Sequence, residues 1–106
     1  MDRNERAAFR KLVADVLTAI EQRDAMKLPA EQGLWAPFIA QLRHLQTLIA
    51  NDGEPSLAEL ARITVGHMAL REIAEEPEDV PPDLLPLWKT LHKVQTGVMS
   101  YYAPFP

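Results

Sequence analysis

The chain has 106 residues, of which 47% are hydrophobic and 25% are charged, and this balance indicates one globular domain over residues 1–106 rather than a disordered segment. It contains no cysteine, which excludes disulfides and thiolate metal sites and favours a reducing compartment. The net charge is −4, and Lys and Arg do not cluster as phosphate binding requires, so we expect no direct nucleic-acid partner.

The first residues, MDRNERAAFRKL, are charged and lack the apolar centre of a signal peptide. No uninterrupted apolar run approaches the roughly 20 residues that span a bilayer. These two features predict a cytoplasmic protein that does not bind a membrane.

The first predicted helix extends from Asp2 to about Met26. Asp2 and Glu5 have the spacing of an N-cap and its reciprocal partner, and Pro29 disfavours helical geometry at Leu28. The apolar residues follow the i, i+3, i+4, i+7 pattern of one helix face. They are Phe9, Leu12, Val13, Val16, Leu17 and Ile20.

A second helix is predicted between Gly33 and the sequence Asn51-Asp52-Gly53, in which glycine favours a helix C-terminus. Pro37 is placed in the first turn, where its missing N–H costs nothing. The apolar face comprises Trp35, Phe38, Ile39, Leu42, Leu45 and Ile49.

The third predicted helix opens on Ser56 and Glu59, which have the spacing of a capping box, and runs to about Glu75, before Pro77. Its small residues would let a neighbouring helix approach closely, so we expect it to be central. They are Ala58, Ala61, Gly66 and Ala69. The acidic, proline-rich sequence EEPEDVPPD follows as a stiff connector.

The segment 57–73, which begins LAELAR, has an alternative interpretation as a helix-turn-helix of a DNA-binding regulator. Gly66 is the only residue in it that could supply the turn, and the end of the segment is acidic, which phosphates would repel. We therefore favour one continuous helix and keep the DNA-binding regulator as the alternative.

The fourth predicted helix starts at Asp83, has Pro86 in its first turn and runs towards Tyr102. One apolar stripe comprises Leu84, Leu87, Trp88, Leu91, Val94 and Val98, and a second comprises Leu85, Trp88, His92 and Met99. Alternating strand patterns are missing throughout. The sequence therefore predicts an all-α protein: an antiparallel four-helix bundle with short loops and an extended aromatic C-terminal tail.

Three histidines, His44, His67 and His92, fall near the middles of the last three predicted helices, but none has a further His, Asp or Glu three or four residues away. Bundle metal sites normally include such carboxylates. There is no thiol, no glycine-rich phosphate loop and no serine within reach of a histidine on its own helix. We expect no metal, no cofactor and no enzymatic activity.

The two stripes of the fourth helix together are wider than a bundle position needs, and exposed apolar surface usually marks an interaction site. The tail could instead fold back as a lid over the end of the bundle, or simply fray, and these three possibilities stay open. The predicted contacts to a protein partner, or to a second copy in a homodimer, are Leu85, Trp88, His92, Met99, Tyr101, Tyr102 and Phe105.

These features favour a small non-enzymatic regulatory protein that binds a protein partner through an apolar helix face and inhibits or sequesters it. Compact acidic helical proteins of this build include bacterial antiactivators of transcription regulators and immunity proteins, an analogy of build alone. An immunity protein for a nuclease would typically present its acids as a phosphate mimic, whereas here they gather mainly in one connector. An antiactivator is therefore the preferred hypothesis.

Overall fold

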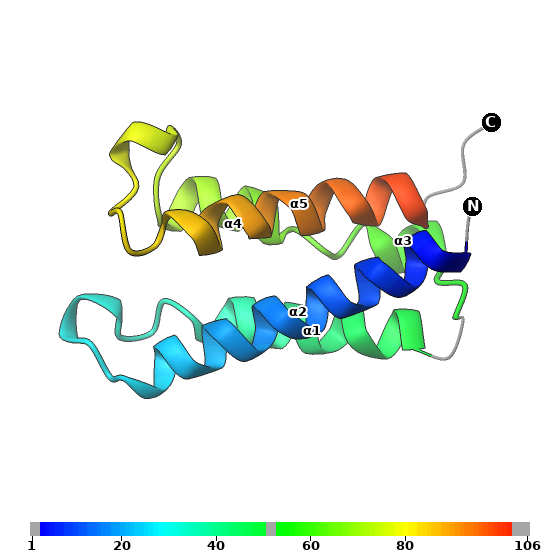
Figure 1. Ribbon diagram of the computed structural model, residues 1–106, viewed down its shortest axis with the longest axis horizontal. Coiled ribbons are helices and arrows are strands. Elements are labelled where there is room, and N and C mark those ends of the chain that lie inside the picture. The colour runs from blue at the N-terminus through cyan, green and yellow to red at the C-terminus, as the bar shows by residue number, and fades with distance from the viewer. Residues whose placement is uncertain (1–2, 51–52, 103–106) are drawn as a thin grey trace.

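The structure is a computed structural model that describes residues 3–50 and 53–102. Within these residues, four main helices pack side by side and alternate in direction (Figure 1). They are α1 (Arg3–Ala25), α2 (Ala36–Ile49), α4 (Val65–Glu72) and α5 (Leu85–Tyr101). α1 packs against α2 and α5, and α4 packs against α5 and α2. The predicted all-α antiparallel bundle is confirmed.

Three short elements complete the described chain: the 3₁₀ turns η1 (Pro29–Glu31) and η3 (Pro77–Asp79), and the single turn α3 (Leu57–Leu60). No strand occurs in the ranges that the structure describes. Likewise, none of the helices in those ranges has both the length and the apolar character needed to cross a bilayer. The predicted N-cap Asp2, the predicted stop at residues 51–52 and the tail at 103–106, which includes Phe105, lie outside the described residues.

The core is built from the apolar faces that helical spacing predicts. Residues from α1, α2 and α5 meet there, and a fully buried aliphatic side chain stabilises the fold by about 1.5–3 kcal/mol. The largest side chains without exposed surface include Trp35, Phe38, Ile20, Leu42, Leu45 and Leu91. Leu12 is an exception on α1, because it is only partly buried at the edge of the core.

The prediction of one continuous helix from Ser56 to Glu75 is wrong. The capping box of Ser56 and Glu59 is present, but α3 ends after a single turn at Leu60, and α4 begins only at Val65. The chain between the two helices is not helical at Ile63. Two glutamine side chains from neighbouring helices bind the backbone at this break.

Gln41 on α2 accepts a hydrogen bond from the N–H of Thr64 (2.8 Å) and donates one to the Thr64 hydroxyl (3.0 Å). Gln95 on α5 accepts from the N–H of Gly66 (3.0 Å) and donates to the carbonyl of Ile63 (2.8 Å). These bonds satisfy backbone groups that the break would otherwise leave unpaired. Tertiary hydrogen bonds thus stabilise the break.

An ion-pair network ties the loop after α1 to the start of α5. The Arg23 guanidinium donates to both carboxylate oxygens of Glu31 (2.8 and 2.5 Å) and to Asp83 (2.8 Å). The indole of Trp35 also donates to Glu31 (2.8 Å). These donors, Arg23 first, hold the pKa of Glu31 below its usual range, although burial opposes the shift.

Candidate functional site

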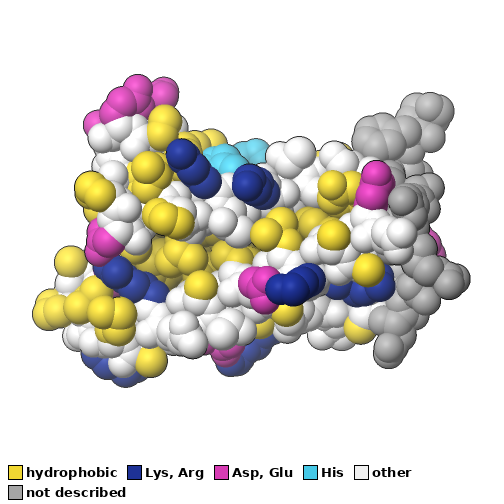
Figure 2. All heavy atoms as spheres, in the orientation of Figure 1, with side chains coloured by type: hydrophobic (Ala, Val, Ile, Leu, Met, Phe, Trp, Pro, Cys, Tyr) yellow, Lys and Arg dark blue, Asp and Glu magenta, His cyan; other side chains and the backbone are white. Residues whose placement is uncertain are grey.

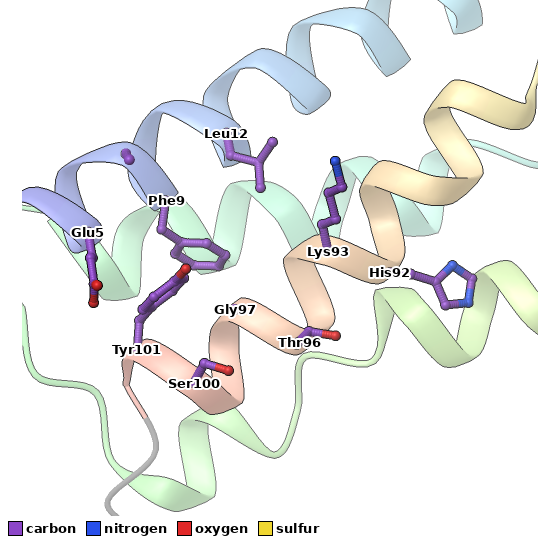
Figure 3. A pocket seen from close by; sticks show the side chains of 10 residues that line it. Glu5, Phe9, Leu12, His92, Lys93, Thr96, Gly97, Ser100 and Tyr101 are labelled. Atoms are coloured by element: carbon purple, nitrogen blue, oxygen red, sulfur yellow. The ribbon is translucent and has the colours of Figure 1, made fainter.

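An open groove of about 670 Å³ lies between α1 and α5. Figure 2 shows apolar side chains along the seam between these two helices. α1 contributes Glu5, Ala8, Phe9 and Leu12, and α5 contributes His92, Lys93, Thr96, Gly97, Ser100 and Tyr101 (Figure 3).

The floor of the groove is the ring of Phe9, which lies directly against the backbone of α5. A Cβ atom built on Gly97 would be only 2.3 Å from the Phe9 ring, so only glycine permits this contact. The neighbouring side chains of Ala8, Thr96 and Ser100 are short and leave space beside the ring, which is itself buried (3% exposed). The groove therefore follows from small residues on two facing helices.

Two tyrosines lie at the C-terminal end of α5, and one of them, Tyr101, lines the groove. The rings of Tyr101 and Tyr102 are tilted against Phe9, with centroid separations of 5.5 and 5.9 Å. Arg6 adds a cation–π contact at 4.4 Å from the Tyr102 ring and donates a hydrogen bond to the Tyr101 carbonyl (3.0 Å). The two tyrosines therefore pack on α1 as a lid would.

Arg6 also connects this end of the bundle to the loop before α3. Its guanidinium forms an ion pair with Glu54 and lowers the pKa of that carboxyl. The contacts of Arg6 thus join α1, the end of α5 and the loop that follows α2.

Charged groups stand at opposite ends of the groove. The side chains of Glu5 and Lys93 are both exposed, and neither forms an ion pair with another described residue. Beside Lys93, the imidazole of His92 packs at a tilt against the Trp88 ring (ring centroids 4.3 Å apart), and its Nδ1 lies 2.8 Å from the Trp88 carbonyl. The His92 Nε2 atom is buried and has no hydrogen-bond partner among the described residues.

Of the residues predicted to contact a partner, only His92 and Tyr101 line the groove. Met99 is exposed (47%) on α5, and Leu85 is partly buried against the core. Phe105 lies outside the described residues.

Two other predicted contacts, Trp88 and Tyr102, are buried, with 8% and 5% of their surface exposed. The Trp88 indole donates to the carbonyl of Ala74 (2.9 Å), just after α4. Trp88 therefore covers the end of α4. Trp88, which belongs to both predicted stripes, does not face outward in the described structure.

The sequence interpretation missed Phe9, Lys93, Gly97 and Ser100 as groove residues. The available signal was a row of small side chains on α5, at positions 96, 97 and 100, that faces α1. Apolar periodicity does not detect such a row, because it scores large hydrophobic residues.

The three histidines do not come together. His44 and His67 are exposed on different helices, and the described part of the chain contains no group of three or more His, Asp or Glu side chains that could hold a metal ion.

Comparisons of the chain with protein-family models, with curated proteins and with solved structures found no match.

Proposed function

We propose that this protein is a small non-enzymatic regulatory protein that binds a protein partner in the groove between α1 and α5 and thereby inhibits or sequesters it. The observation that supports the proposal is the groove itself, about 670 Å³ and open, with the Phe9 ring as its apolar floor. Grooves between helices are a recurring binding site for segments of other proteins.

Within the groove, charges stand only at Glu5 and Lys93, and the surface between them is apolar or carries small hydroxyl groups. Such a lining suits the burial of apolar side chains, which is the main favourable contribution to protein association.

Sequestration of a transcription regulator remains the preferred form of this function over toxin immunity. The acidic connector, with η3, lies at the end of the bundle remote from the C-terminal end of α5 (Figure 1). A phosphate-mimicking surface would therefore not coincide with the groove.

The alternative, a DNA-binding regulator that uses residues 57–73, has less support. A helix-turn-helix needs two helices that pack together, whereas α3 has four residues. We also propose that the free protein forms a homodimer through the exposed face around Met99. Sedimentation of the wild type and of Met99→Ser tests this, and a wild-type monomer would contradict it.

The test of the main proposal is affinity purification, from the cells that produce the protein, of three tagged forms: wild type, Ser100→Trp and Thr18→Trp. The indole at 100 would fill the groove, whereas Thr18 is exposed on α1 outside it. We expect one stoichiometric protein with the wild type and with Thr18→Trp, and at least about tenfold less with Ser100→Trp, the scale of a binding hot spot.

Circular dichroism establishes that all three forms are folded. Equal recovery of the partner by Ser100→Trp would refute the groove as the binding site. Recovery of DNA fragments instead of a protein would favour the DNA-binding alternative.

A further inference from the structure

The two charges of the groove are separated along its length. Glu5 precedes Phe9 by one turn of α1, and Lys93 precedes Gly97 by one turn of α5. Phe9 and Gly97 are in contact and the two helices are antiparallel, so the charges lie on opposite sides of this contact (Figure 3). At a rise of about 1.5 Å per residue, they are about 12 Å apart along the groove.

Both charges are available to a ligand. Some charged residues of the described chain are paired, for example Lys11 with Asp15 on α1 (2.8 Å). Glu5 and Lys93 have no such pair, and α5 carries no acidic residue that could neutralise Lys93. The apolar floor lies between them, so a charge in the middle of a bound segment would be desolvated without compensation.

We infer that the groove binds an amphipathic helix of a partner protein that carries a basic and an acidic residue about two turns apart, on either side of an apolar stripe. This inference rests on the proposed function and specifies its partner. In a helix, a separation of about 12 Å corresponds to seven or eight residues, a spacing that keeps both charges on the face of the apolar stripe. The basic residue then pairs with Glu5 and the acidic residue with Lys93.

A second copy of this chain is a poorer occupant. In a two-fold dimer, each Glu5 could face the Lys93 of the other copy, so the charges alone would permit it. The shape of the groove does not favour it, because two hollow surfaces that face each other leave unfilled space between them, and unfilled space forfeits packing contacts. A helix is convex and fills the hollow.

The probes for this inference are synthetic helical peptides of about 16 residues, stapled on the face away from the groove, with a leucine stripe. One peptide carries Arg and Glu eight residues apart beside the stripe. Two controls carry Arg at both positions or Glu at both. Fluorescence anisotropy measures their affinities for the wild type, for Lys93→Glu and for the double reversal Glu5→Lys with Lys93→Glu.

We expect the wild type to bind the Arg/Glu peptide about three- to tenfold more tightly than either control, because exposed ion pairs contribute modestly. Lys93→Glu should instead prefer the Arg/Arg peptide. The double reversal should regain the preference for the Arg/Glu peptide, which then lies in the opposite direction. Added salt should reduce all these preferences.

Equal affinities for all three peptides, blocked by Ser100→Trp, would overturn the inference and leave the groove as a protein-binding site. The inference also fails if no peptide binds while Ser100→Trp still loses the cellular partner. A wild-type dimer that Ser100→Trp dissociates would assign the groove to a second copy and overturn the inference too. If Ser100→Trp still binds both the peptide and the cellular partner, the proposed function itself is contradicted.

Discussion

Replacement of Gly97 by Ala tests whether the floor of the groove is built as described. The new methyl group would lie 2.3 and 2.6 Å from two atoms of the Phe9 ring, whereas carbon atoms rest about 3.5–4.0 Å apart. The ring must therefore move by about 1 Å or more. The rings of Tyr101 and Tyr102 restrict this movement, because their centroids are already 5.5 and 5.9 Å from that of Phe9.

Overpacking of this kind costs about 1–3 kcal/mol, and the better helix propensity of alanine returns about 1 kcal/mol. Because the ring is confined, we expect the upper part of the range, a net loss of about 2 kcal/mol. In a domain of this size, that corresponds to a fall of about 10 °C in Tm. Thermal unfolding followed by circular dichroism measures it.

Thr96→Ala is the matched control, because position 96 is the exposed neighbour on the same helix and alanine there gains helix propensity without a clash. In a Phe9→Ala background, itself destabilised by about 3–5 kcal/mol, Gly97→Ala should become stabilising by about 1 kcal/mol. A higher Tm for Gly97→Ala in the wild-type background would refute the contact between the ring and α5.

Three further perturbations test other contacts. Gln95→Ala leaves the two backbone groups at the break between α3 and α4 without their partner, and chemical unfolding should show a loss of about 1–3 kcal/mol. Tyr102→Phe should leave Tm within a few degrees of the wild-type value or raise it, because the buried hydroxyl has no hydrogen-bond partner among the described residues. The lowered pKa of Glu31 beside Arg23 adds stability that is present above pH 5 and is lost as the pH falls below about 4.3 towards the folded-state pKa. Unfolding measured at several pH values should show this loss for the wild type and a weaker loss for Glu31→Gln.

The helices of the bundle could be predicted because their evidence is local. On α1, Val13, Val16 and Ile20 recur at the helical period, and all three are buried. Prolines also mark boundaries that the structure confirms, since Pro37 lies in the first turn of α2 and Pro86 in the first turn of α5. These signals need no knowledge of the neighbouring helices.

The break between α3 and α4 could not be predicted, because its cause is not local. No proline separates Leu60 from Val65, and the β-branched residues and glycine at 63–66 lower the helix propensity without fixing where a helix ends. Gln41 and Gln95 come from distant parts of the chain, and their amides bind the backbone at the break. Hydrogen bonds from other helices thus override the local propensity.

The groove was missed for a related reason, since it depends on what α5 faces on each side. The apolar residues of α5 suggested one face for the core and a spare face for a partner. The described structure divides them differently: Leu91 and Val98 are in the core, Trp88 covers the end of α4, and Met99 remains exposed. The hollow itself lies where side chains are small, beside Gly97, because α1 supplies the ring that a larger residue on α5 would displace. A groove between two helices therefore depends on the side chains of both helices, and it can be recognised only once their packing is known.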